Sequence, residues 1–208
     1  LNASRSVRRN SPGTGAGGLA ARTDLPTPGP SGSFAIQDLN HDQVPDVVVA
    51  NRWPASTVVS LFVGDGTGGF LPRADLETGR WLGNIAIADV NRDGRADLVM
   101  TSSGTGGQGM AISVLTGNGD GTFGQRVDSP AGNISGPLAL GDLNEDGSPD
   151  VLILHFWSDT VSVFLGNGDG TFRMGTSVVL GPILNDLMTG DVNLDGHLDV
   201  VVAQYGAP

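Results

Sequence analysis

Short apolar runs alternate along the chain with clusters of glycine, aspartate and asparagine. The runs are rich in valine, isoleucine and leucine, which is typical of β-strands, and the clusters between them are typical of turns. One set of runs enters an acidic loop (85–88 and 138–140), a second leaves it (47–50, 98–100, 151–154 and 200–203), and a third enters a glycine-rich turn (58–63, 112–115 and 161–165). The pattern predicts an all-β fold.

Two markers recur in phase at intervals of about 51 residues. The acidic loop begins at Asp38, Asp89, Asp142 and Asp191, and the glycine turn occupies 64–70, 117–123 and 166–172, with a degraded copy at 13–19. Four strands in a period of this length are typical of a propeller blade. We therefore expect a single β-propeller domain of four-stranded blades over residues 1–208. Its repeats are expected at about 1–30 (degraded and partial), 31–82, 83–135, 136–184 and 185–208 (partial).

The two ends of the chain fall at the same point of the repeat. Residues 200–208 match 47–55, and residues 1–7 resemble the segment near 56–59. A four-bladed ring with one blade shared by both termini fits this register, and so does a segment of a ring of seven or eight blades. Because the chain begins with Leu1, we expect a processed or excised piece of a longer polypeptide. A partial ring would expose blade faces, through which self-association is expected.

Each acidic loop places oxygen-bearing side chains at its positions 1, 3, 5 and 9, and a backbone carbonyl at position 7 is available as a further ligand. Such a set suits a hard cation such as Ca²⁺, which takes six to eight oxygens. The side-chain candidates are Asp38, Asn40, Asp42 and Asp46; Asp89, Asn91, Asp93 and Asp97; Asp142, Asn144, Asp146 and Asp150; and Asp191, Asn193, Asp195 and Asp199. The carbonyl candidates are Val44, Arg95, Ser148 and His197. We expect three to four Ca²⁺ ions.

The alternative for these loops is a set of solvated turns, because aspartate and asparagine favour turns in any case. Fourfold repetition of the same frame favours the metal sites. EF-hands are excluded because the flanks are strands and position 12 holds Val49, Met100, Ile153 and Val202 where an EF-hand needs glutamate. A structural role for the metal is favoured over a catalytic one. The first loop departs from the others, with Gln43 in place of glycine and with Pro45 before the last ligand, so its ion is expected to be weaker or absent.

Composition supports the loops as the main electrostatic feature. The net charge is −11, from 22 acidic and 11 basic residues, and the aspartates of the four loops account for the whole excess. There is no basic stripe that would favour nucleic acid, and no apolar run approaches the roughly 20 residues of a membrane-spanning helix. The absence of cysteine excludes disulfides and thiolate metal sites. Calcium at millimolar concentration is found outside cells, so a secreted or cell-surface location is expected.

The acidic loop, the apolar strand after it and the Gly-Asn-Gly-Asp-Gly-Thr-Phe turn together resemble FG-GAP/VCBS repeats, which form the integrin α-subunit propeller. The resemblance covers the chain from about Gly13 onward. It implies a calcium-binding β-propeller that acts as a non-catalytic recognition or adhesion module, with a carbohydrate or an extracellular protein as ligand. It also leaves open two alternatives, the propeller portion of a secreted polysaccharide lyase or hydrolase, and a structural spacer of a surface protein.

Few residues outside the loops suggest chemistry. Trp53 and Trp157 occupy equivalent connectors, with Tyr205 one position earlier in the last repeat, and such aromatics either stack on sugar rings or pack between blades. No catalytic residues are identified, because the aspartates are committed to loops and turns. The histidines His41 and His197 are at non-ligand side-chain positions, and His155 follows a buried-type strand. A lyase would need Arg52, Arg80, Arg126 and Arg173 to gather at one end of the ring.

Overall fold

The computed structural model describes residues 6–10, 22–51, 57–103, 109–132, 136–156, 158–181 and 184–205. Its elements are sixteen β-strands, and within these residues no helix is present that could cross a membrane. All pairings between neighbouring strands are antiparallel. The all-β prediction is therefore confirmed.

Three four-stranded sheets form the centre of the molecule, and each follows the chain from strand to strand without a crossover. The first blade is β3 (Ser31–Gln37), β4 (Asp46–Asn51), β5 (Val58–Phe62) and β6 (Ala74–Glu77). The second is β7 (Trp81–Ala88), β8 (Asp97–Ser103), β9 (Met110–Gly117) and β10 (Phe123–Gly132). The third is β11 (Leu138–Gly141), β12 (Asp150–His155), β13 (Thr160–Gly166) and β14 (Phe172–Val179).

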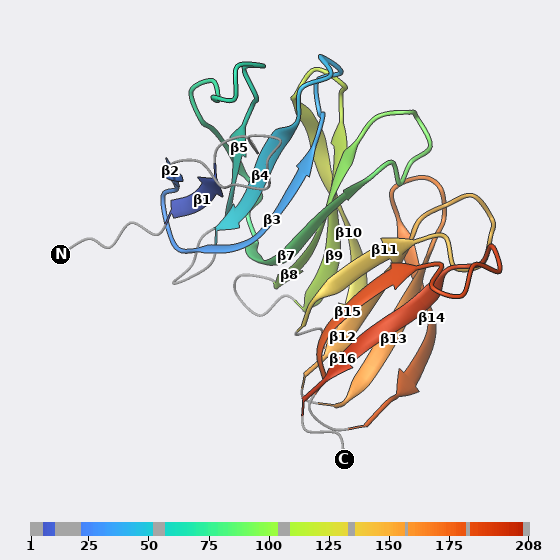
Figure 1. The fold of residues 1–208 in the computed structure, drawn as a ribbon. Coiled ribbons are helices and arrows are strands. Elements are labelled where there is room, and N and C mark those ends of the chain that lie inside the picture. Colours follow the sequence, from blue (N-terminus) through green and yellow to red (C-terminus); the bar gives the residue numbers. More distant parts are fainter. Residues whose placement is uncertain are drawn as a thin grey trace.

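A two-stranded sheet stands at each end of this array. One is β1 (Ser6–Asn10) with β2 (Arg22–Pro26), and the other is β15 (Leu184–Gly190) with β16 (Asp199–Gln204). The blades follow one another in chain order, with β3 against β7, β7 against β11 and β11 against β15 (Figure 1). This is the side-by-side arrangement of propeller blades.

The core lies between the blades. Val48, Val59 and Leu61 of the first blade pack against Leu98 and Met100 of the second. Similar apolar clusters join the second blade to the third and the third to β15. Strands β4, β8 and β12 are buried along almost their whole length. Neighbouring blades cover their faces, except that Leu25 of the β1–β2 hairpin packs on one face of β4. This explains why their sequences are continuous apolar runs and do not alternate.

A chain of polar side chains also crosses each complete blade. In the second blade, Ser102 Oγ lies 2.6 Å from Ser113 Oγ, and the Ser113 hydroxyl donates to Asp128 Oδ1 at 2.6 Å. The corresponding residues are Asn51, Ser60 and Asp75 in the first blade and His155, Ser162 and Ser177 in the third. Each central serine hydroxyl (Ser60, Ser113 and Ser162) is paired on both sides inside its sheet, where an unpaired polar group is costly, and Asn51 Oδ1 is a buried oxygen left without a partner.

Candidate metal-binding loops

Each acidic loop connects the first strand of a blade to the second, and its opening aspartate folds it. In the second loop, Asp89 Oδ1 accepts the N–H of Asp93 at 3.1 Å, and Oδ2 accepts the N–H of Gly94 at 2.8 Å. The same two hydrogen bonds recur at Asp38, Asp142 and Asp191. The predicted frame is therefore also a structural frame, repeated four times.

Positions 3 and 5 turn toward position 1. The N–H of Asp93 lies 3.0 Å from Asn91 Oδ1 as well as 3.1 Å from Asp89 Oδ1, so these two oxygens converge on one point. Asn91 Nδ2 in turn donates to Asp93 Oδ2 at 3.1 Å. The other three loops show the same contacts at Asn40, Asn144 and Asn193. Converging carboxylate and amide oxygens form the donor set that a hard cation prefers.

The residues at position 7, expected to offer backbone carbonyls, follow directly. The N–H groups of Val44, Arg95, Ser148 and His197 each donate to the aspartate at position 5, at 2.7–2.9 Å. Within the described residues, no three acidic or histidine side chains meet in a metal-ligand cluster. The two side-chain oxygens that converge in a loop come instead from one aspartate and one asparagine.

The aspartate at position 9 has a role beyond the one predicted from the sequence. Asp97 is fully buried; its Oδ2 accepts the N–H of Val90 in its own loop at 2.9 Å, and its Oδ1 accepts the N–H of Gly117 in the glycine turn at 2.8 Å. Asp46 and Asp150 make the same pair of bonds, to Leu39 and Gly64 and to Leu143 and Gly166. Asp199 keeps the bond within its loop, to Val192.

The aspartate at position 9 therefore joins the acidic loop to the glycine turn in each complete blade. A carboxylate oxygen that accepts one N–H retains a second lone pair, so this role leaves room for a metal contact. The constant phase between the acidic loop and the glycine turn was the signal in the sequence that could have revealed the link.

The pKa shifts of the loop aspartates differ in direction. Burial raises the pKa of Asp97, hydrogen bonds from Gly117 and Val90 oppose the rise, and the charges of Asp93 and Asp89 add to it. The pKa of Asp38 is lowered on balance, because burial raises it but backbone N–H groups, that of Gln43 first, lower it more. Hydrogen bonds from the Ser148 backbone and the Asn144 side chain lower the pKa of Asp146. Mutual repulsion of carboxylates in the second loop is a force that a bound cation would relieve.

The first loop differs at position 6, as expected from its sequence. Gly94, Gly147 and Gly196 adopt φ between +81° and +90°, and Gln43 must adopt φ +67° at the same place. A side chain in this left-handed region costs roughly 1 kcal/mol or more. The backbone geometry is kept, so the departure appears as strain and not as a different loop shape.

Position 4 links the second loop to the third and the third to the fourth. His41, Arg92, Glu145 and Leu194 all have φ between +58° and +62°. Arg92 donates to the backbone carbonyl of Asp146 at 2.6 Å and also contacts Asp146 Oδ1 and Ser148 Oγ. Glu145 contacts the imidazole of His197. The second, third and fourth loops therefore form a continuous polar rim along one end of the blades.

The glycine turns close against this rim. The N–H groups of Gly121 and Gly170 donate to the carbonyls of Leu39 and Val90, at 3.2 and 3.1 Å. Each carbonyl belongs to the acidic loop of the preceding blade. Within the turns, Asp120 Oδ1 accepts both the N–H and the hydroxyl of Thr122, which lowers the pKa of Asp120. Asp65 and Asp169 do the same with Thr67 and Thr171. These aspartates serve turn chemistry, as the sequence analysis interpreted them.

The remaining candidates are more scattered. Trp53, Trp157 and Arg52 lie outside the described residues, and Tyr205 is exposed at the end of β16. Arg80 is buried, where its guanidinium contacts Ser102 and Asp128, and Arg126 donates to the other oxygen of Asp128. Arg173 is exposed on β14. Two of the four arginines considered for a lyase are thus occupied by one structural carboxylate.

His155 does not form a catalytic pair with a serine. Its Nε2 lies 2.9 Å from Ser162 Oγ, but Ser162 is buried and its hydroxyl also contacts Ser177. The equivalent positions in the other blades hold Asn51 and Ser102, so His155 is one version of the polar chain across a blade.

The fold and the loops define a class of repeat protein, and comparison with known families agrees. The family model described as FG-GAP-like repeat matches residues 38–100 and 142–202, more than half of the chain, and the chain belongs to this family. No curated protein matches it.

Solved structures resemble it at low sequence identity. A protein of unknown function from Bacteroides caccae is 13% identical with a TM-score of 0.52, over 94% of this chain and 63% of that one. The chain thus spans less than two thirds of that protein's length. A lectin from Agrocybe aegerita that recognises non-reducing terminal N-acetylglucosamine is 18% identical over 81% of this chain and 60% of that one, with a TM-score of 0.35. Only the first of these likenesses supports the fold.

Proposed function

We propose that this chain is a calcium-stabilised, non-catalytic recognition or adhesion module of a secreted or cell-surface protein. The observation that carries the proposal is the convergence of the side-chain oxygens at loop positions 1 and 3 on one point, repeated in four loops. Three or four ions would be bound, most weakly in the first loop because of Gln43.

In each loop the ion would be held by the aspartates at positions 1 and 5, the asparagine at position 3 and the carbonyl at position 7. The aspartate at position 9, which is buried in the first three loops, would contribute a free lone pair. Bound calcium would neutralise the carboxylates that repel one another, as at Asp89, Asp93 and Asp97. Extracellular modules bind calcium with dissociation constants of about 10⁻⁴–10⁻³ M. At millimolar calcium each site would then add about 0.5–1.5 kcal/mol of stability.

The ligand of the module is proposed to be a carbohydrate or another extracellular protein. Aromatic side chains with a polar edge suit sugar rings, and Trp53, Trp157 and Tyr205 are the candidates for this contact. Exposure of Tyr205 supports its candidacy. The lyase or hydrolase alternative is weakened because Arg80 and Arg126 are committed to Asp128. The spacer alternative is separated from recognition by experiment.

The metal proposal is tested by thermal unfolding in millimolar calcium and in excess chelator, with bound ions counted by native mass spectrometry. Three or four ions and a clear fall in melting temperature on chelation are expected. The double variant Asp89→Asn/Asp93→Asn should lose one ion, and Asp120→Asn in the glycine turn should lose none. A metal-free protein with no chelator effect would reduce the loops to hydrogen-bonded turns.

Recognition is tested on a glycan array with the wild type and the Trp53→Ala/Trp157→Ala variant. Binding that disappears in the variant supports a lectin. Turnover of a polyuronide would support the lyase, and the absence of both would leave the spacer.

A further inference from the structure

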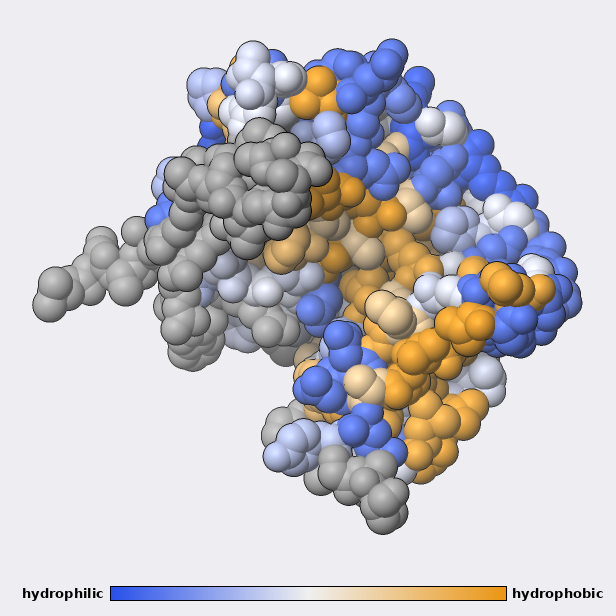
Figure 2. Space-filling view, viewed as in Figure 1, coloured by the Kyte–Doolittle hydropathy of each residue, from blue (hydrophilic) through white to orange (hydrophobic). Residues whose placement is uncertain are grey.

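The second, third and fourth acidic loops contact one another along the polar rim, and each contact starts from position 4 of a loop. Arg92 of the second loop reaches the third, and Glu145 of the third loop reaches the fourth. In the space-filling view, the edge of the molecule that carries these loops is largely hydrophilic (Figure 2). The candidate calcium sites are therefore neighbours in contact, and a change in one loop can reach the next.

Arg92 places a positive charge on a candidate ligand of the third loop. Its Nη2 donates to the backbone carbonyl of Asp146 at 2.6 Å, lies 3.3 Å from Asp146 Oδ1 and contacts Ser148 Oγ. Asp146 is position 5 of the third loop, where a side-chain oxygen is expected to hold the ion, and Ser148 is position 7. Because like charges repel, the guanidinium and a bound cation would compete for the same carboxylate.

The backbone of Arg92 belongs to the second loop. It adopts φ +60°, in the left-handed region that side chains avoid. The residues on either side of it are bonded to each other: Asn91 Oδ1 accepts the N–H of Asp93 at 3.0 Å, and Asn91 Nδ2 donates to Asp93 Oδ2 at 3.1 Å. Asn91 and Asp93 are also the candidate ligands at positions 3 and 5. A cation held by both would fix Arg92 more firmly in the conformation whose side chain reaches Asp146.

Position 4 behaves differently at the other two junctions between loops. His41 of the first loop lies beside Gly119, together with the aliphatic part of Arg95. Glu145 of the third loop contacts the imidazole of His197, whose side chain is not a candidate ligand. Within the described residues, neither side chain contacts a candidate ligand carboxylate of the next loop. The junction between the second and third loops is therefore the one at which a single residue has its backbone in one site and its charge on the other.

We infer that the second and third loops bind calcium with negative coupling and that Arg92 transmits it; this rests on the calcium sites proposed above. A cation in the second loop fixes Arg92 on Asp146, where the guanidinium charge opposes a cation in the third loop. A cation in the third loop displaces the guanidinium and so removes a contact that holds Arg92 in place within the second. The two effects are one coupling free energy, so each ion weakens the other by the same factor.

The test is a calcium titration followed by NMR and read at the amide of position 6 in each loop. Gly94 and Gly147 report the second and third loops separately, because each N–H donates to the first aspartate of its own loop, at 2.8 and 2.7 Å. Asn91→Ala and Asn144→Ala each remove one neutral ligand, so the charge of the loop is kept. Loss of one ion should lower the dissociation constant of the other about two- to fivefold, the size expected for a partly exposed ion pair. The gain appears at whichever loop fills second in the wild type.

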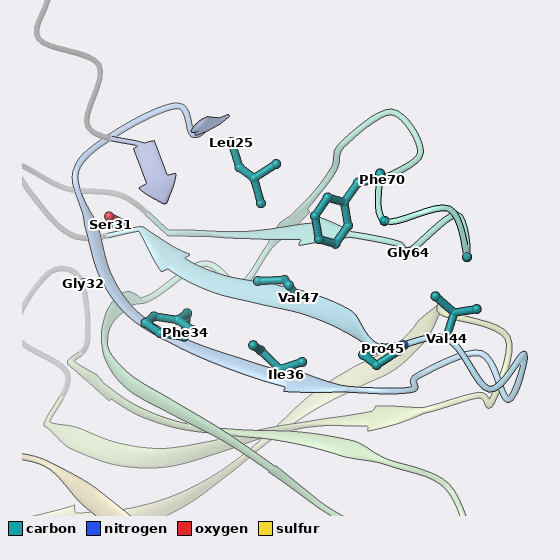
Figure 3. A pocket seen from close by; sticks show the side chains of 13 residues that line it. Leu25, Ser31, Gly32, Phe34, Ile36, Val44, Pro45, Val47, Gly64 and Phe70 are labelled. Carbon is teal, nitrogen blue, oxygen red and sulfur yellow. The ribbon is translucent and has the colours of Figure 1, made fainter. Parts of the chain in front are cut away.

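Arg92→Gln provides the decisive comparison. In that background, Asn91→Ala and Asn144→Ala should no longer change the affinity of the other loop. Asn40→Ala, the same substitution in the first loop, is the matched control and should leave the third loop unchanged. The first loop has no described contact with the third, and its position 7 is Val44, which lines an apolar groove beside the first blade (Figure 3). Metal-free spectra of every variant check that the fold is kept.

The outcomes separate this inference from the proposed function. If calcium shifts both Gly94 and Gly147 but neither affinity responds to substitution in the other loop, the coupling is overturned and the calcium sites stand. Coupling of the opposite sign, or coupling that persists in Arg92→Gln, overturns the inference as well. If calcium shifts neither glycine, the calcium proposal itself fails and the coupling fails with it.

Discussion

Asp97 and Gly117 are 20 residues apart in sequence, and a hydrogen bond of 2.8 Å joins the buried carboxylate of one to the backbone N–H of the other. The second oxygen of Asp97 holds the N–H of Val90. One side chain thus fixes the acidic loop against the glycine turn in the interior of the blade.

Asp97→Asn is expected to destabilise the protein by about 2–4 kcal/mol, because the amide replaces one acceptor oxygen with a donor and leaves a buried N–H unpaired. Chemical denaturation in chelator, which removes any metal contribution, measures the change. Asp120→Asn is the control, since Asp120 is exposed and makes its bonds within one turn. Equal effects of the two substitutions would contradict the role assigned to Asp97.

Gln43→Gly is expected to stabilise the protein by about 0.5–1 kcal/mol, because φ +67° at position 43 suits glycine and strains glutamine. The reverse change, Gly94→Ala, should cost about 1–2 kcal/mol. A Cβ added at Gly94 meets no other atom within 4 Å, so this cost isolates the backbone conformation. Unfolding free energies of the two variants test the pair, and a destabilised Gln43→Gly protein would be inconsistent with strain at that position.

Arg92→Gln is expected to increase the calcium affinity of the third loop about two- to fivefold. The guanidinium of Arg92 lies 3.3 Å from Asp146 Oδ1, where its positive charge opposes a cation on the same carboxylate. Both partners are partly exposed, which keeps the effect small. Calcium titration by calorimetry checks the affinity, with Arg173→Gln on β14 as the control for charge alone. Weaker binding in Arg92→Gln would show that the arginine supports the site.

The glycine turns should lose stability in acid. Hydrogen bonds from the side chain and backbone of Thr122 hold the pKa of Asp120 below its ordinary value of 3.8. The stabilisation is therefore present above that value and is lost as the pH falls through the lower pKa of the folded state. Melting temperatures across this acid range should fall less steeply for Asp120→Asn than for the wild type. Asp97 acts with the opposite sign, because its raised pKa makes ionisation unfavourable to the folded state as the pH rises.

The sequence predicted strands and loops well because each is encoded within a few residues. The run Asp46-Val-Val-Val-Ala recurs as Asp199-Val-Val-Val-Ala, and both form the second strand of a blade. Their environments differ: β4 is buried throughout and β16 is largely exposed. Burial depends on neighbouring blades, which the local pattern does not encode.

For the candidate metal-binding loops, the sequence likewise predicted the contacts within a loop but not those between distant residues. Oxygens of Asp38 and Asn40 converge on the N–H of Asp42, because these residues lie within one turn. The aspartate at position 9 accepts a hydrogen bond from a glycine N–H that is 16 to 20 residues away. The contact of Arg92 with Asp146 spans 54 residues. Such partners follow from the packing of whole blades, so no spacing rule within one loop could identify them.

The polar chain across each blade has a consequence for folding. A propeller repeats nearly the same apolar strand several times, and valines fit a neighbouring strand almost equally well after a slip of two residues. The central serines of the blades would not fit after such a slip, because each hydroxyl would lie beside apolar side chains without a partner. These serines are Ser60, Ser113 and Ser162. The three blades also combine different residues with that serine, so strands exchanged between blades would pair poorly. Correct alignment is therefore specified by a few hydroxyl groups within an otherwise interchangeable set of strands.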